Sequence, residues 1–90
     1  MKKDFYKNLQ RKLAKTSDWP SLYMFKFIVP ADQDKIAAVE ALFDESTEVL
    51  RRYSNGGKYV SLTGKEIMLT PEDVIQRYTE AAVIEGLIAL

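Results

Sequence analysis

Residues 22–29 constrain the fold more than any other part of this chain. They are dense in aromatic and branched side chains and Pro30 follows them, which is typical of a β-strand. With a period of two, one face carries the core-forming residues Tyr23, Phe25, Phe27 and Val29. The other face carries Met24, Lys26 and Ile28, and its lysine predicts that this face is less completely buried.

A helix is predicted over residues 32–45. Asp32 can accept a hydrogen bond as the N-cap, and Asp34 in the first turn suits the positive end of the helix dipole. Apolar side chains recur at helical spacing, namely Ile36, Val39, Leu42 and Phe43. This stripe predicts a helix that packs one face on a sheet.

A β-hairpin is predicted next. Its strands are residues 47–53 and 59–63, and the second can continue to Met68. The turn over residues 55–57 contains Asn and Gly, which adopt a positive φ at little cost. In the second strand Val60 and Leu62 face the core, and the other face carries Tyr59, Ser61 and Thr63.

The clearest helix start lies at Thr70-Pro71-Glu72-Asp73. Thr70 caps it, Pro71 takes the first helical position, and the two acidic residues suit the helix dipole. The buried stripe is Val74, Ile75, Tyr78, Ala81 and Ala82. Gly86 then breaks the helix, and residues 87–90 predict a short apolar strand.

The basic and acidic residues, thirteen of each, cancel in number but are unevenly spread along the chain. Residues 1–18 hold six basic and two acidic side chains, a net +4, so residues 19–90 carry −4. Within residues 4–16 the apolar positions Phe5, Leu9 and Leu13 repeat every four residues, as do the basic positions Lys3, Lys7, Arg11 and Lys15. This predicts an amphipathic helix, which is too short to be stable unless its apolar stripe packs on something.

These elements predict an α+β domain over residues 19–90 with an N-terminal helix in residues 1–18. After that helix the order is β-α-β-β-α-β, the ferredoxin-like pattern, in which a four-stranded antiparallel sheet carries two helices on one face. The other sheet face is left open unless the N-terminal helix or a second copy covers it. Exposed Met24 and Ile28 on that face predict self-association.

The chain has no His and no Cys. Disulfides, thiolate nucleophiles, imidazole metal sites and the Ser-His-Asp and Cys-His arrangements are therefore excluded. The carboxylates Asp32, Asp34, Asp44, Glu45 and Glu48 do not have the spacing of a calcium-binding loop. We expect no catalytic residue, no metal, no cofactor and no enzymatic activity.

Several short motifs resemble the YbeD-type family of small bacterial proteins, whose fold is ferredoxin-like and ACT-like. The most specific is Arg-x-Ser-x-x-Gly-Lys-Tyr-x-Ser, matched by Arg52, Ser54, Gly57, Lys58, Tyr59 and Ser61. Trp19-Pro20 and the Phe25-Lys26 pair extend the likeness to residues 19–90. ACT domains bind small ligands such as amino acids, and some family members are encoded beside genes of lipoate metabolism. The resemblance therefore implies a regulatory role, with a link to lipoate metabolism.

The candidate binding residues are the cations, hydroxyls and aromatic ring expected on the open sheet face and the hairpin: Lys26, Arg52, Ser54, Lys58, Tyr59 and Ser61. Such a set can bind an anionic small molecule or a partner's carboxylate. The register of the first hairpin strand is open, so the choice of Arg52 over Arg51 depends on the resemblance alone. The alternative is an ordinary half-exposed sheet face, with no binding role.

We expect a cytoplasmic, non-enzymatic regulatory or interaction domain. Its partners would be a small ligand, a protein or a second copy, the last through the sheet face or the N-terminal helix. The alternative is a nucleic-acid-binding protein that uses the basic N-terminal helix. The zero net charge speaks against nucleic acid, and so does Tyr59 as the one stacking residue expected on the open face. No apolar run follows Met1-Lys2-Lys3, so we expect neither a targeting signal nor a membrane partner.

Overall fold

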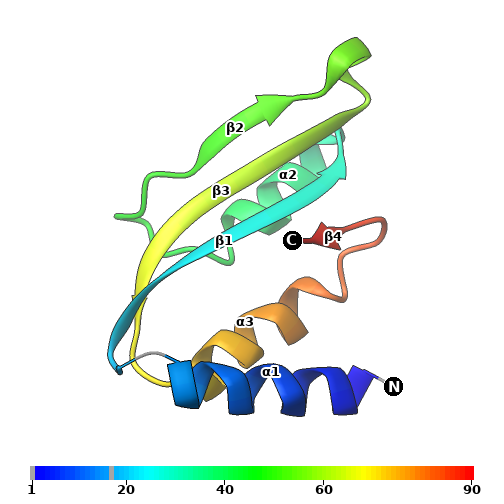
Figure 1. The fold of residues 1–90 in the computed structure, drawn as a ribbon. Helices are drawn as coiled ribbons and strands as arrows, with labels where there is room; N and C mark the ends of the chain where they lie inside the picture. The colour runs from blue at the N-terminus through cyan, green and yellow to red at the C-terminus, as the bar shows by residue number, and fades with distance from the viewer. Residues whose placement is uncertain (1, 17) are drawn as a thin grey trace.

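The computed structural model describes residues 2–16 and 18–90 (Figure 1). Met1 and Ser17, and the side chains of Lys2 and Lys3, lie outside the described part, so the predicted segment 1–18 is covered incompletely. The elements are α1 (Lys2–Thr16), β1 (Ser21–Pro30), α2 (Gln33–Glu40), β2 (Leu50–Tyr53), the 3-10 turn η1 (Asn55–Gly57), β3 (Tyr59–Met68), α3 (Pro71–Ala81) and β4 (Ile88–Ala89).

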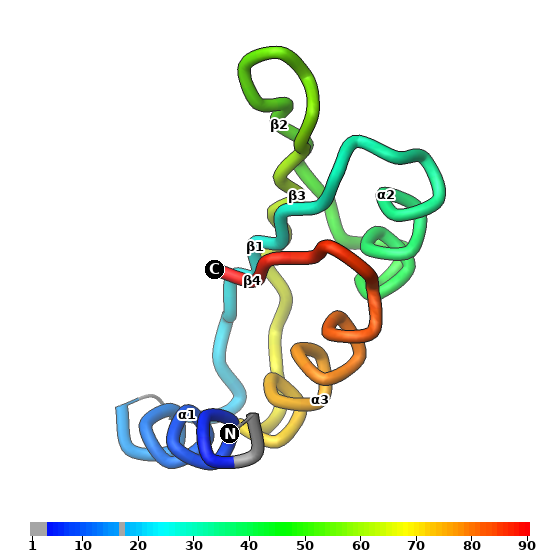
Figure 2. The backbone as a smooth tube through the Cα atoms, turned by 90° about the vertical axis from the view of Figure 1, so that its right-hand side faces the viewer, coloured from blue at the N-terminus to red at the C-terminus, as the bar shows by residue number. Residues whose placement is uncertain are grey.

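The four strands form one antiparallel sheet in the order β2-β3-β1-β4. The two long strands, β1 and β3, pair along their whole length, with Phe25 opposite Gly64. The tube view shows α2 and α3 on the same side of the strands (Figure 2). The predicted α+β class and antiparallel sheet are confirmed, and this arrangement is compatible with the ferredoxin-like pattern.

The alternation in β1 sets the core. Phe25, Phe27 and Val29 are fully buried beneath the helices. On β3, Val60 and Leu62 are fully buried on the same side, as predicted. Because each such side chain contributes about 1.5–3 kcal/mol on burial, these two strands fix which sheet face the helices cover.

Helix α2 is shorter than predicted, ending at Glu40 rather than at residue 45. Ala41 N still donates to Ala37 O, four residues back, but the two amides after it bond only three residues back, with Leu42 N donating to Val39 O and Phe43 N to Glu40 O. This turn places the Phe43 ring against Gly64, where a Cβ atom would lie 2.7 Å from Phe43 Cε1. Helical spacing alone does not reveal that Phe43 reaches the core through a turn.

The hairpin strands also differ from their predicted bounds. Strand β2 begins at Leu50 instead of residue 47, because Thr47 lies in a turn in which its amide donates to Asp44 O at 2.9 Å. Strand β3 continues to Met68, the longer of the two expected lengths. Strand β4 is limited to Ile88–Ala89.

Helix α1 packs against α3 at one end of the molecule (Figure 2). Gln10 Nε2 donates to Glu72 of α3 at 3.1 Å, and Trp19 Nε1 donates to Leu13 O at 3.1 Å. The helix does not cover the open sheet face, where Leu22 and Met24 are 60% and 53% exposed. In the single chain, α1 therefore packs on α3 and leaves the open sheet face uncovered.

None of the helices in the described residues is both long and apolar enough to cross a membrane.

Candidate functional site on the open sheet face

The side of the sheet turned away from α2 and α3 is called the open face here. Strand pairing and alternation place twelve residues on it: Leu22, Met24, Lys26, Ile28, Leu50, Arg52, Tyr59, Ser61, Thr63, Lys65, Ile67 and Ile88. Three of these strand residues are basic and none is acidic, although the chain as a whole is neutral. The open face is therefore apolar and cationic, and the strand acid Glu66 points to the helix side.

A shallow hollow of about 230 Å³ lies on the hairpin half of the open face. Its lining includes five of the six predicted site residues, and the complete set is Lys26, Ile28, Arg52, Tyr53, Ser54, Tyr59 and Ser61. They meet there because Ser61 lies between Arg52 on β2 and Ile28 on β1 in the strand register. The sixth, Lys58, does not line the hollow, and its carbonyl accepts from Ala31 N at 2.9 Å.

The register distinguishes Arg52 from Arg51. Arg52 pairs with Ser61 and shares its face, whereas Arg51 pairs with the buried Leu62 and points to the helix side. There the Arg51 guanidinium lies 2.9 Å from Glu40. The structure thus places Arg52 at the hollow and gives Arg51 an acidic partner.

Two hydroxyls at the hollow hold the hairpin itself. Ser54 Oγ accepts from Tyr59 N at 3.1 Å, and Ser61 Oγ donates to Arg52 O at 3.3 Å. The groups left to meet a ligand are the ammonium of Lys26, the guanidinium of Arg52 and the phenol of Tyr59. In the described part of the chain the ion pairs are Arg51–Glu40 and Arg77–Glu66, so Lys26 and Arg52 have no carboxylate partner. Two unpaired cations beside a hollow suit an anionic group.

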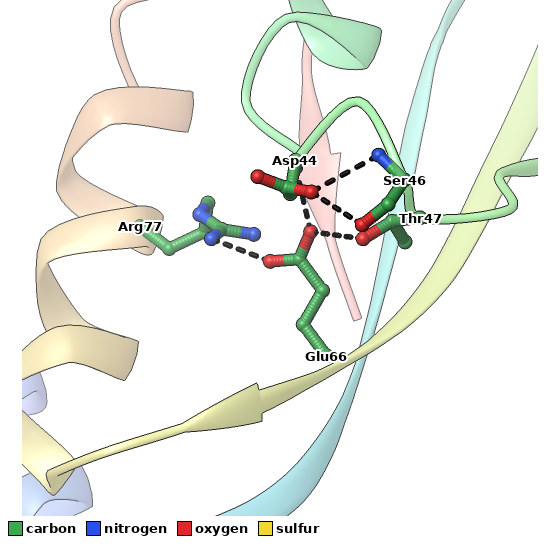
Figure 3. Close-up of polar contacts among 5 residues, drawn as sticks. All are labelled: Asp44, Ser46, Thr47, Glu66 and Arg77. Carbon is green, nitrogen blue, oxygen red and sulfur yellow. Dashed lines mark hydrogen bonds and ion pairs between the residues drawn. The ribbon is translucent and has the colours of Figure 1, made fainter.

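A second polar cluster, which the sequence did not predict, lies on the helix side (Figure 3). Glu66 Oε1 is 2.7 Å from Arg77 Nη2 of α3, while Glu66 Oε2 accepts from Asp44 N at 2.7 Å and from the Thr47 hydroxyl at 2.6 Å. Asp44 in turn caps its own turn by accepting from Ser46. One carboxylate thereby joins β3, α3 and the segment between α2 and β2.

The guanidinium of Arg77 is also held by aromatic rings. Its Cζ atom lies 4.8 Å from the centre of the Phe25 ring and 5.4 Å from that of Phe43. Nη1 is buried with no hydrogen-bond partner, which the two ring faces offset in part. Its contacts with core side chains make this cluster a part of the scaffold.

Burial acts to raise the pKa of Glu66, but hydrogen bonds from Thr47 and Asp44 and the charge of Arg77 together outweigh it. The pKa of Glu66 therefore lies below its usual value. A sequence signal for this pair exists: Glu66 has the same strand parity as the buried Val60 and Leu62. An acidic residue on a core face requires a cation or several donors.

Over residues 2–16 and 18–90, no group of three carboxylates gathers in a way that could hold a metal ion.

Comparison with known proteins finds no matching family model, no matching curated protein and no matching solved structure. The resemblance to the YbeD-type family therefore depends on the sequence motifs alone and stays a prediction.

Proposed function

We propose that this chain is a non-enzymatic regulatory or interaction domain with a ferredoxin-like fold, which binds an anionic group at the hollow on its open face. The anion is a carboxylate of a small ligand or of a partner protein. The fold assignment is supported by the β-α-β-β-α-β order after α1 and by the strand order β2-β3-β1-β4.

One observation carries the proposal. Lys26 and Arg52, from two strands that are not adjacent, line the same hollow without a carboxylate partner in the described residues. The guanidinium groups of Arg51 on β2 and Arg77 on α3 are both paired with glutamate. An anion that bridges the free pair would gain charge-assisted hydrogen bonds from both side chains.

The same charges bear on self-association. A face-to-face dimer through the open face would bring Lys26, Arg52 and Lys65 of one copy opposite the same cations of the other. Like charges in such an interface are unfavourable. We therefore favour an acidic ligand or partner over a second copy on this face.

The test is a titration of the whole chain with small carboxylates, namely succinate, glutamate and lipoate, followed by amide chemical shifts and by thermal stability. Because a ligand that binds the folded state raises the midpoint, at least one compound should raise it and shift the amides of Lys26, Arg52 and Ser61. Lys26→Glu and Arg52→Glu should each remove the effect.

Lys65→Glu is the matched control, because Lys65 lies on the same face but does not line the hollow. It changes the net charge by the same amount and should retain most of the binding. An equal loss in all three variants, or no response to any carboxylate, would contradict the proposal.

A nucleic-acid role stays the second candidate because of one feature of α1. Its basic residues Lys7, Arg11, Lys12 and Lys15 are exposed, on a helix whose other side packs on α3. If α1 binds nucleic acid, the unmodified protein should shift single-stranded DNA or RNA in a gel at low salt, and substitution of both Lys7 and Arg11 by Glu should abolish that shift. No shift of the unmodified protein would exclude it.

A further inference from the structure

Within residues 2–16 and 18–90, half of one edge of β1 has no neighbouring strand. β1 has ten residues, but β4 pairs only with Phe27 and Ile28. One more bond, from Leu90 N to Lys26 O at 3.0 Å, closes this short ladder. Figure 1 shows β4 beside only one half of β1. Residues 21–25 therefore form a free edge on the side away from β3.

The bond to Lys26 O fixes which backbone groups face this edge. Because successive residues of a strand point their N–H and C=O groups to opposite sides, Met24 and Leu22 present theirs in the same direction as Lys26. Tyr23 and Phe25 direct theirs toward β3. In the described residues β4 pairs only with Phe27 and Ile28, so no strand supplies partners for the edge-facing backbone groups of Met24 and Leu22.

This edge lacks the features that usually prevent strand pairing. Natural edges are protected by charged side chains, proline or a bulge, because an unprotected edge pairs with other chains. Leu22, Tyr23, Met24 and Phe25 contain neither a charge nor a proline, and the register with β3 runs without interruption from Ser21 to Pro30. An apolar, regular and unpaired edge indicates that another segment covers it.

A groove of about 610 Å³ lies beside the same edge on the helix side. Tyr23 of β1, Tyr78 and Ala82 of α3, and Phe5 and Leu9 of α1 are among its lining residues. Most of this lining is aromatic or aliphatic. The groove exists because α1 packs on α3 and β4 is too short to fill the space between α1 and the sheet.

We propose that the free edge of β1 and this groove bind an extended peptide segment of a partner protein, apolar at alternate positions. The peptide adds to the sheet as a strand beside residues 21–25 of β1, in line with β4. An extended backbone supplies donors and acceptors for Met24 and Leu22, which neither a helix nor an apolar small molecule can do. Residues of the added strand opposite Tyr23 and Phe25 point to the helix side and into the groove. This site is separate from the cationic hollow and does not depend on it.

The first test uses five-residue synthetic peptides, matched to residues 21–25, with threonine alternating with valine, leucine or phenylalanine. They are titrated into the isotope-labelled whole chain. Because edge pairing is largely independent of sequence, at least one peptide should bind with a Kd of about 1 mM or tighter. The amides of Leu22 and Met24 should then exchange with solvent at least about tenfold more slowly, since they become hydrogen-bonded.

Backbone N-methylation of the bound peptide separates strand pairing from simple apolar contact. The apolar residues fix the register, so one alternate set of peptide amides faces β1 and the other faces solvent. Methylation of the first set should weaken binding by about tenfold or more, and methylation of the second set should leave it nearly unchanged. Equal effects of the two methylation patterns would overturn the proposal.

Variants of the chain test the groove and the edge separately. Ala82→Trp fills the groove and should abolish binding, whereas its control Val83→Trp alters a neighbour that is 84% exposed and outside the groove. Met24→Lys places a charge at the free edge and should also abolish binding. Its control Leu50→Lys changes a residue of similar exposure, 59%, on the opposite edge strand.

Three further outcomes would overturn the proposal: no peptide binds, the shifted amides lie outside β1 and the groove, or the control variants lose binding as fully as the test variants. Sedimentation of the peptide-free chain adds a fourth. A stable dimer that is broken by Met24→Lys and is not dissociated by any peptide would show that a second copy, and not a partner peptide, covers this edge.

Discussion

The carboxylate of Glu66 on β3 lies 2.7 Å from the guanidinium of Arg77 on α3, in the interior between the sheet and the helix. The two side chains are only 9% and 14% exposed. This pair joins the end of β3 to α3 and, through Thr47, to the segment that precedes β2. It therefore holds together parts of the fold that the backbone ladder does not connect.

Loss of this pair should destabilise the protein strongly. Glu66→Ala leaves Arg77 buried without its partner, and we expect the free energy of unfolding to fall by about 3–5 kcal/mol in urea titrations followed by circular dichroism. The control Glu40→Ala breaks the exposed pair with Arg51 and should cost a small fraction of that. Similar losses in the two variants would contradict a buried, structural role for Glu66.

The lowered pKa of Glu66 predicts sensitivity to acid. Burial raises the pKa of Glu66, but the hydrogen bonds and the charge of Arg77 lower it by more than burial raises it. The pKa therefore lies below the usual 4.5. The stabilisation is therefore complete above the unfolded-state pKa and is lost as the pH falls through the folded-state value. Below about pH 5 the unfolding free energy should fall more steeply than that of Glu66→Gln, so the two curves converge. Parallel curves would show that this carboxylate is not the group responsible.

Gly64 should not tolerate a side chain. A Cβ atom there would lie 2.7 Å from Cε1 and 3.0 Å from Cδ1 of Phe43, so Gly64→Ala should destabilise the protein by about 1–3 kcal/mol in thermal or urea unfolding. In the double variant with Phe43→Leu the clash is relieved. Its loss should be smaller than the sum of the two single losses. Additive losses would mean that the loss at Gly64 does not come from contact with the Phe43 ring.

The hydroxyls of Tyr23 and Tyr78 lie 2.8 Å apart, and burial raises the pKa of Tyr78 well above its usual 10.0, with help from the hydrogen bond to Tyr23. The neutral form is favoured in the folded state, so this stabilisation is present below the usual pKa and is lost as the pH rises above it. A spectrophotometric titration should show a late step from Tyr78, because its pKa is raised. Tyr78→Phe should remove that late step and cost about 1 kcal/mol, while the exposed control Tyr53→Phe should keep it.

Local patterns account for much of the fold. The alternation in β1 correctly assigned Phe25, Phe27 and Val29 to the core, because a strand that packs on one side must repeat with a period of two. Thr70 and Pro71 marked the start of α3 correctly, and Thr70 Oγ1 accepts from Asp73 N at 3.2 Å. Such features depend on neighbours in sequence, so the sequence reveals them.

Tertiary packing decided where the elements end. The apolar spacing of Leu42 and Phe43 extended α2 to residue 45 in the prediction. The chain leaves the helix at Glu40, because Phe43 fits over Gly64 and the next amide bonds to Glu66. Gly64 and Glu66 are distant in sequence, and no local pattern links them to the end of this helix.

For the candidate sites too, the sequence indicates the types of residue and the tertiary structure decides where they meet. The types of residue at the hollow, cations and hydroxyls on a hairpin, could be selected from the sequence, including Lys26 and Arg52. That they line one hollow, that Lys58 does not, and that Arg51 points to the other side follow from the strand register, which is set by pairing between distant segments. The free edge of β1 and its groove had no sequence signal, since they arise from the shortness of β4 and the packing of α1 on α3.

The sequence by itself therefore determined the element types, the buried face of each long strand and the chemistry that lack of His and Cys excludes. Only the tertiary structure decided which charges meet, where α1 lies and which strand edge stays open. The physical reason is range: helix caps and strand alternation arise from contacts within a few residues, whereas ion pairs, grooves and unpaired edges depend on how distant segments pack.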